Sequence, residues 1–197
     1  MFLWKFPVTD IFGGFMRVLK ENLRIAVSGK SGCGNTSVCK RLSSLLGLQL
    51  VNWTFRNLAD ERGMTLEQVI ESAKHDPSYD RLVDTRQVEL ARQQPSVLGS
   101  RLAIWMLDDA DFKVFLTASA ETRASRIVQR EGGNFDEVFS FTKMRDSEDS
   151  RRYLELYGID NSSFDFADLV VNTEDYDIDG VVNLILQGLK SENLIDF

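Results

Sequence analysis

Short apolar runs alternate with stretches of helical periodicity over residues 23–197. The apolar runs predict five buried strands, at residues 24–28, 48–51, 96–98, 112–117 and 169–171. The segments between them predict helices at about 35–46, in pieces over 54–93, at 101–107, at 121–131, after 134 and at 178–189. Strands that alternate with helices are joined by right-handed crossovers and form a parallel sheet. We therefore expect one α/β domain in which helices cover both faces of a five-stranded parallel sheet.

Local signals mark the ends of several of these helices. Thr65 and Gln68 have the spacing of a capping box, and Asn134 can cap a further helix that carries Glu137 at its third position. The glycine pair at 132–133 precedes that helix and indicates a hinge.

Residues 1–22 differ from the rest and are interpreted as an N-terminal extension of a domain formed by residues 23–197. Their apolar stretch is too short and too interrupted for a membrane span, and no cleavage site typical of a signal peptide follows it. Glycines at 13 and 14 weaken the alternative of a helix that lies on a membrane surface. We expect an added helix that packs on the domain or on a partner subunit, with an apolar face of Ile11, Phe12, Phe15, Met16 and Leu19.

The composition is that of a globular protein, with 43% hydrophobic and 27% charged residues. A net charge of -7 disfavours a nucleic-acid partner, because the phosphate backbone attracts basic surfaces. Cys33 and Cys39 are too few for a disulfide framework, and the single histidine, His75, is expected at a helix end, far from them in the sequence. We therefore expect a cytoplasmic protein without stable membrane insertion.

The strongest local signal is the run GKSGCGNT at residues 29–36, between a buried strand and the start of a helix. Such glycines let successive N–H groups turn toward an anion, and the helix N-terminus adds partial positive charge. Thr36 is placed to offer its hydroxyl to Mg²⁺. The alternative is a glycine-rich turn that binds nothing. The predicted phosphate-binding residues are Gly29, Lys30, Ser31, Gly32, Cys33, Gly34, Asn35, Thr36 and Ser37.

One position of this loop departs from the usual pattern. Asn35 stands where a P-loop has the lysine that contacts the outer phosphates. Its absence removes a positive charge from the place where negative charge moves during phosphoryl transfer. Lys30, in the same loop, is the residue that could reach the phosphates by another route.

A kinase of small phosphates also needs a cationic site for the group that accepts the phosphoryl. Thr54 and Arg56 follow the second predicted strand, and Arg101 follows the third. Ligands of open α/β sheets bind at the carboxyl edge of the strands, where an arginine can hold a phosphate with two parallel hydrogen bonds. These residues are therefore candidates for the acceptor site, although Arg56 could equally be a solvated helix arginine.

Arginine-rich helices flank the glycine pair at 132–133. In each helix the charged residues concerned are three or four positions apart and so share one face. This arrangement favours a lid over residues 130–158 that closes on phosphates, rather than solvated faces laced with ion pairs. The residues concerned are Arg123, Arg126 and Arg130 before the glycines, and Arg145, Asp149 and Arg152 after them.

Several ordered motifs resemble the short cytidylate kinases of the archaeal type and their bacterial relatives, which are P-loop nucleoside monophosphate kinases. The similarity covers about residues 23–190. The motifs are SGKSGCGNTS at 28–37, FRNLADERGM at 55–64, DPSYD at 76–80, LGSRLAIW at 98–105, and the segment 145–160, which ends in RRYLELYGID.

The resemblance implies transfer of the γ-phosphoryl group of ATP to CMP or dCMP with Mg²⁺, and a helical acceptor-binding insert at 52–94. It assigns Arg56 and Arg101 to the acceptor nucleotide, and Arg145 and Arg152 to the transferring phosphates. The catalytic residues expected from the loop, the lid and the resemblance together are Lys30, Arg130, Arg145 and Arg152.

Two departures from the family pattern leave alternatives open. One is Asn35 in the loop, and the other is Gly99, which stands where relatives often carry an acidic residue. The leading hypothesis is an active kinase. The alternatives are a nucleotide-binding protein of little kinase activity that acts through a partner, and a P-loop kinase for another small acceptor such as UMP.

Overall fold

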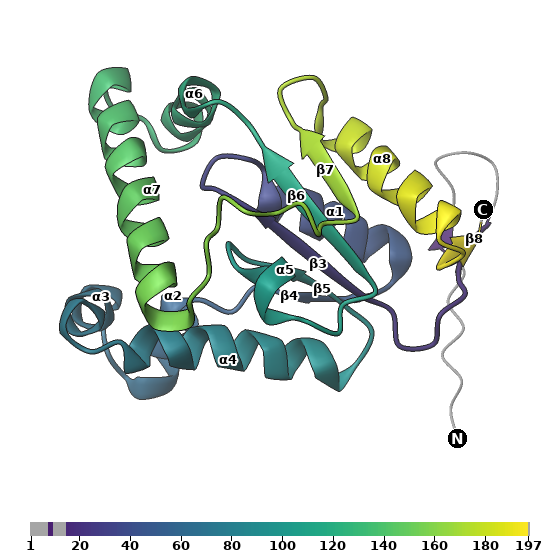
Figure 1. Cartoon of the computed structure of the whole chain (residues 1–197), viewed down its shortest axis with the longest axis horizontal. Helices are drawn as coiled ribbons and strands as arrows, with labels where there is room; N and C mark the ends of the chain where they lie inside the picture. The colour runs from purple at the N-terminus through teal and green to yellow at the C-terminus, as the bar shows by residue number, and fades with distance from the viewer. Residues whose placement is uncertain (1–7, 10–14, 197) are drawn as a thin grey trace.

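A five-stranded parallel sheet forms the centre of the computed structural model, which describes residues 8–9 and 15–196. The strand order is β4-β5-β3-β6-β7, with β3 in the middle, hydrogen-bonded to β5 and β6 (Figure 1). All four strand pairings are parallel, as the alternation of strands and helices predicts. The strands are β3 (Arg24–Gly29), β4 (Gln49–Val51), β5 (Ser96–Gly99), β6 (Phe112–Thr117) and β7 (Leu169–Asn172).

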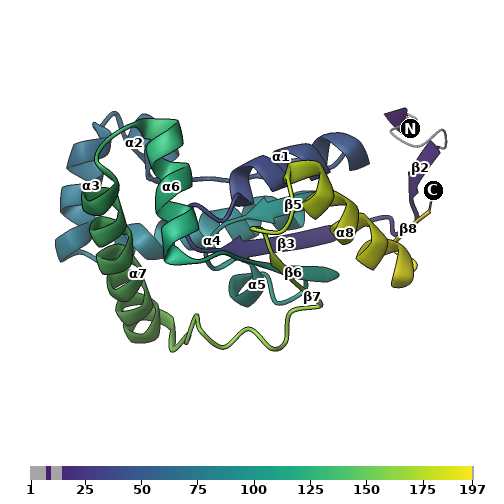
Figure 2. The ribbon, with the colours of Figure 1, turned by 90° about the horizontal axis from the view of Figure 1, so that it is seen from above.

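Helices cover both faces of this sheet, which confirms the predicted fold class. Alternate residues of β3 enter two separate cores: Val27 packs with the helices α1 and α8, and Ala26 packs with α4 and α5. Figure 2 shows α1 and α8 together on one side of the strands. The bounds are α1 (Asn35–Leu46), α4 (Ser78–Gln93), α5 (Ala103–Met106) and α8 (Ile178–Ser191).

Residues 52–94 are almost entirely helical, as predicted. The helices α2 (Phe55–Arg62) and α3 (Leu66–His75) pack with α4 around a small core of their own that contains Leu58 and Val69. The capping box before α3 forms as expected, because Thr65 Oγ1 accepts a hydrogen bond from the Gln68 backbone at 3.2 Å and Gln68 Oε1 accepts one from the Thr65 backbone at 2.8 Å.

The helices α6 (Ala120–Glu131) and α7 (Phe135–Tyr157) pack together near the carboxyl ends of the strands (Figure 2). Asn134 caps α7, because its Oδ1 accepts hydrogen bonds from the backbone N–H groups of Asp136 and Glu137 at 2.9 and 3.2 Å. The far end of α7 reaches α4, where the Tyr157 hydroxyl donates to Asp84 at 2.7 Å. The helix α7 therefore spans the distance from the sheet edge to the helical insert (Figure 1).

The helix expected over residues 11–19 is wrong where the structure describes it. Phe15–Val18 is a strand, β2, which pairs antiparallel with β8 (Ile195–Asp196) and with β1 (Val8–Thr9). Pairing with a distant segment supplies the backbone hydrogen bonds that a helix would have made internally, and Val18 packs against the α1 and α8 core. The rest of the expected helix, at 11–14, lies outside the described residues.

Over residues 8–9 and 15–196, no helix is both long and apolar enough to cross a membrane.

Candidate active site

The glycine-rich loop leaves the end of β3 and enters α1 directly. Gly32 and Gly34 have φ values of +88° and +97°, a left-handed conformation that side chains rarely tolerate. A Cβ on Gly32 would also lie 2.8 Å from the Cβ of Arg123, so the loop packs against the backbone of α6. These turns place successive N–H groups at the N-terminus of α1, which carries no acidic residue in its first turn. The loop is built to hold an anion.

The hydroxyl residues of the loop fit a site for Mg²⁺ bound to a nucleotide. Thr36 and Ser37 are exposed in the first turn of α1. No cluster of three or more acidic, histidine or cysteine side chains suited to a metal occurs in the part of the chain that the structure describes. Mg²⁺ takes few protein ligands and completes its shell with phosphates and water, so a single hydroxyl beside an anion nest suits it.

Asn35 faces back toward the strand and supplies no charge to the loop. Its Nδ2 donates a hydrogen bond to the Gly29 carbonyl oxygen at 2.9 Å. Cys33 is buried, and its burial raises the pKa of the thiol, so this residue is a packing group of the loop and not a reactive one.

Lys30 is the cation of this loop, and it forms an ion pair with α7, part of the segment expected from the sequence to be a lid. Its Nζ lies 3.6 Å from Asp146 Oδ2 on α7. Asp146 also accepts two hydrogen bonds from the buried guanidinium of Arg123, at 2.6 and 3.3 Å. Since Arg123 donates a further hydrogen bond to the Ser31 carbonyl at 3.2 Å, the loop, α6 and α7 meet at Asp146.

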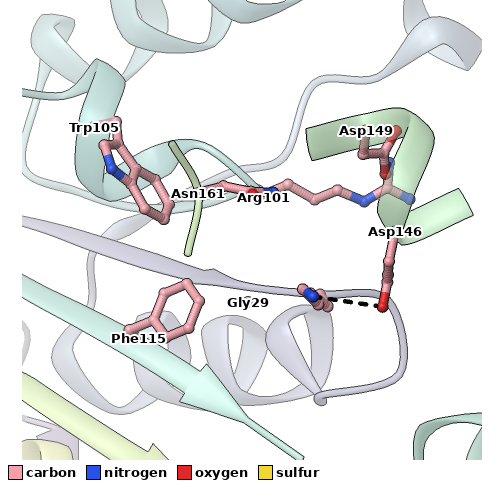
Figure 3. A pocket seen from close by; sticks show the side chains of 8 residues that line it. Gly29, Arg101, Trp105, Phe115, Asp146, Asp149 and Asn161 are labelled. Atoms are coloured by element: carbon pink, nitrogen blue, oxygen red, sulfur yellow. Dashed lines mark ion pairs between the residues drawn. The ribbon is translucent and has the colours of Figure 1, made fainter. Parts of the chain in front are cut away.

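Arg101 joins the loop to α7 from the end of β5. Its guanidinium donates to Ser31 Oγ at 2.8 Å and forms an ion pair with Asp149 Oδ2 at 2.7 Å. In Figure 3, Arg101, Asp146 and Asp149 lie on one side of a pocket that the rings of Trp105 and Phe115 close on the other side. The pocket thus combines the positive charge of Arg101 with an aromatic wall.

The lid arginines divide into two groups. Arg123 and Arg126 are bound by other groups of the protein. Arg126 donates a hydrogen bond to the Thr173 carbonyl oxygen at 2.7 Å, and Arg123 donates one to Asp146 Oδ2 at 2.6 Å. Arg130 and Arg145 line a second hollow between α6 and α7, next to Ser31. Burial lowers the pKa of Arg145, and the nearby charge of Arg101 lowers it further. In the second group Arg130 also pairs with its neighbour Glu131, and both arginines face the hollow.

Arg152 lies farther along α7 and binds acidic side chains. It donates to Asp149 Oδ1 at 3.0 Å and lies 3.6 Å from Asp80 Oδ1 on α4. The predicted common face of Arg145, Asp149 and Arg152 is consistent with these contacts.

The two residues predicted after the second strand lie at α2. Thr54 is the N-cap of α2, where its backbone N–H and hydroxyl donate to Asn57 Oδ1 at 2.8 and 3.0 Å. Arg56 is exposed, and its charge contributes to lowering the pKa of Glu67, after the hydrogen bonds from the Glu67 backbone and Thr65. Neither residue lines the pocket of Arg101, so the structure does not bring all predicted acceptor residues together.

Close packing against α1 explains why residue 99 is a glycine in this chain. A Cβ at this position would lie 2.7 Å from the sulfur of Cys39 on α1, closer than side chains approach without displacement. Burial raises the pKa of Cys39 to about 12, so its thiol stays neutral and fills the space as an apolar group.

Several residues of the site were not singled out in the sequence as functional. Asp146 pairs with side chains on two other elements, and Trp105, Phe115 and Asn161 line the pocket from segments far apart in the chain. Trp105 and Asp146 lie inside motifs that carry the family resemblance, which is the signal that could have found them.

A glycine-rich anion loop at a strand–helix junction, faced by arginines from the next strand end and from a helical lid, defines the class of P-loop kinases. A family model described as AAA domain matches residues 25–148. Shikimate kinase from Acinetobacter baumannii shares the fold with a TM-score of 0.60 at 21% identity, over 88% of this chain and 96% of that one. Deoxyadenosine kinase from M. mycoides also shares the fold, with a TM-score of 0.52 at 16% identity, over 85% of this chain and 100% of that one.

Curated relatives are more similar in sequence. Cytidylate kinase 2 of Borreliella afzelii is 39% identical over 87% of this chain and 99% of its own length. Cytidylate kinase of Archaeoglobus fulgidus is 37% identical over 87% of this chain and 97% of its own length. This chain belongs to the cytidylate kinase family, as its motifs indicated.

Proposed function

We propose that this protein transfers the γ-phosphoryl group of ATP to CMP or dCMP. The observation that carries the proposal is the hydrogen bond of 2.8 Å between Arg101 and Ser31, which joins the acceptor pocket to the phosphate loop. A donor phosphate in the loop and an acceptor phosphate at Arg101 would then face each other across one residue. Family membership and this geometry support the same reaction.

The donor half is the loop at residues 29–37 with its backbone N–H groups. Thr36 is the proposed Mg²⁺ ligand, and the metal, when bound, neutralises charge that develops on the phosphates. Arg130 and Arg145 are the proposed lid cations, since both line the hollow next to Ser31. Closure of residues 130–158 would bring them onto the phosphates and exclude water.

The acceptor half is proposed to comprise Arg101 and the helical insert at 52–94. Arg152, expected from the sequence at the transferring phosphates, is assigned to this half instead because it pairs with Asp80 on the insert. Arg101 holds the acceptor phosphate, and the aromatic wall of Trp105 and Phe115 excludes water beside it. Thr54 and Arg56 stand at the exposed rim of the insert, where they would reach a nucleotide when the insert closes.

Lys30 is proposed to supply the positive charge that Asn35 lacks. It lines the same pocket as Arg101 and Asp149, on the side where the phosphoryl group would pass between donor and acceptor. Its present partner is Asp146, at 3.6 Å, and phosphates offer the ammonium more negative charge than that shared carboxylate does. Phosphoryl transfer depends mainly on positioning and charge stabilisation, so such a cation is sufficient without a strong base.

The testing experiment is turnover with ATP and Mg²⁺ against CMP, dCMP, UMP, AMP and GMP. Turnover with CMP and dCMP, and much less with the others, is the expected result, and we propose that the enzyme acts in the cytoplasm. A folded protein that binds ATP but phosphorylates none of the five would contradict the proposal. That outcome would favour a nucleotide-binding protein instead, for which Asn35 at the lysine position is the supporting observation.

A further inference from the structure

The face of α4 that meets α7 carries buried polar side chains. Asp80, Asp84 and Gln87 are spaced by four and three residues, so they lie on one side of the helix. Asp80 is 8% exposed and Gln87 is 5% exposed. Polar side chains on the inner face of a helix need hydrogen-bond partners to offset their loss of water.

Two oxygen atoms on this face have no such partner among the described residues. They are Asp80 Oδ2 and Gln87 Oε1, both fully buried. An unpaired buried acceptor costs about 1–3 kcal/mol, so natural proteins retain it where a water, an ion or a ligand completes it or where it serves the site. Both atoms are acceptors, and the group that completes them is therefore a hydrogen-bond donor.

Ion pairs connect Asp80 to the acceptor pocket. Its second oxygen, Oδ1, lies 3.6 Å from Arg152, which donates to Asp149 at 3.0 Å, and Asp149 pairs with Arg101 at 2.7 Å. The Nε of Arg152 is buried and also lacks a partner among the described residues. The series begins at Arg101, the cation proposed for the acceptor phosphate, and ends at Asp80, whose Oδ2 is unpaired among the described residues. That order suits a ligand with a phosphate at one end and a donor group at the other.

We propose that Asp80, assisted by Gln87, reads the base of the acceptor nucleotide by accepting hydrogen bonds from the exocyclic amino group of cytosine. The inference rests on the proposed CMP kinase function and names a specificity determinant within it. Uracil carries a carbonyl oxygen where cytosine carries the amino group, and two acceptors placed there would repel it. Burial raises the pKa of Asp80, and the nearby guanidinium of Arg152 opposes this rise. In its ionised form the carboxylate can only accept hydrogen bonds. A site built to pair with a donor rejects the analogue that lacks it.

The test compares kcat/KM for CMP and UMP in the wild type, in Asp80→Asn and in a control, Glu89→Gln. Glu89 lies on the exposed side of the same helix, where it pairs with Arg86 at 3.3 Å. An asparagine offers both a donor and an acceptor, so the ratio of CMP to UMP should fall at least ~10-fold in Asp80→Asn and stay unchanged in the control. An equal loss for both nucleotides would overturn the proposal, because it would show that Asp80 acts only by positioning Arg152.

A second variant covers the case in which Asp80→Asn does not fold. Gln87→Met keeps the length of the side chain and removes its acceptor, so it should lower the same ratio. If neither folded variant changes the ratio, the inference is wrong. Should the wild type phosphorylate no nucleotide, the proposed function fails separately. Calorimetric dissociation constants of CMP and UMP for the wild type and both variants would then decide the inference alone: a preference for CMP that the variants lose supports it, and equal affinities refute it.

Discussion

The side-chain amide of Asn35 is hydrogen-bonded to the carbonyl oxygen of Gly29 at 2.9 Å and so joins the two ends of the phosphate loop. The same bond turns the side chain away from the loop interior, where a P-loop lysine would extend. The loop therefore keeps its shape without that lysine, and Lys30 is the one basic residue within positions 29–37.

Replacement of Lys30 by alanine should lower kcat for CMP by at least ~100-fold, the loss typical of one group that stabilises transition-state charge. The measurement is steady-state turnover with ATP and Mg²⁺. Asn35→Lys, added to Lys30→Ala, should restore part of the rate by supplying the charge from the usual position. Lys40→Ala, on the exposed side of α1, is the matched control and should leave kcat unchanged. Normal turnover in Lys30→Ala would show that Lys30 does not replace the missing lysine.

Replacement of Arg101 by lysine keeps the charge but loses the planar guanidinium that contacts Ser31 and Asp149 together. We expect kcat/KM for CMP to fall by at least ~100-fold, because a guanidinium with two parallel hydrogen bonds is not reproduced by an ammonium. Arg151 makes hydrogen bonds of 2.8 and 2.9 Å with Glu155 and Glu148 on the exposed side of α7, so Arg151→Lys serves as control. Similar kinetics in both variants would remove Arg101 from the acceptor site.

Stability should depend on pH through Asp84. Burial raises the pKa of Asp84 to about 6, although the hydrogen bond from Tyr157 opposes the rise. In an unfolded chain the pKa is about 3.9, so the folded state binds the proton more tightly. The resulting stabilisation is fully present below about pH 4 and is lost as the pH rises through about 6.

Asp84→Asn removes this dependence, because the amide does not ionise. The free energy of unfolding of the variant, relative to the wild type, should therefore rise by about 2 kcal/mol between pH 4 and 7. Urea unfolding of both proteins across this range measures the difference. Asp60→Asn, an exposed position on α2, is the control. A constant difference between Asp84→Asn and the wild type would contradict the assignment.

Gly99 and Cys39 should be coupled in stability. Because a Cβ at 99 would lie 2.7 Å from the Cys39 sulfur, Gly99→Asp should cost about 2 kcal/mol of unfolding free energy. In a Cys39→Ala background the cost should be much smaller. Cys33→Ala removes another buried thiol and serves as the control, for which the effects should add. Additive effects with Cys39→Ala would show that the sulfur does not limit position 99.

The strands and helices of the main domain followed from the sequence because their signals are local. Ile25 and Val27 lie in one apolar run, and Thr65 with Gln68 makes a cap within a single turn. The phosphate loop was equally recognisable, since glycine spacing and a following helix suffice to define it. Each of these elements is therefore specified by residues close to it in the sequence.

The parts that were missed depend on partners far away in the chain. Phe15–Val18 became a strand because Ile195–Asp196 lies beside it, and no pattern within residues 11–19 indicates that neighbour. Arg123 looked like a free lid cation, and its burial against Asp146 follows only from how α6 packs on α7. The unpaired oxygen of Asp80 is likewise visible only once α4 and α7 are placed together.

The close approach of Gly99 to Cys39 also constrains how this site can change over evolutionary time. A lineage that gains an acidic residue at 99 first passes through a destabilised protein, unless position 39 has already lost its sulfur. The reverse order, with the smaller residue at 39 first, avoids that intermediate. The order of the two substitutions is thus not neutral. Gly99, which looks like the loss of an acidic side chain, is therefore explained only together with Cys39.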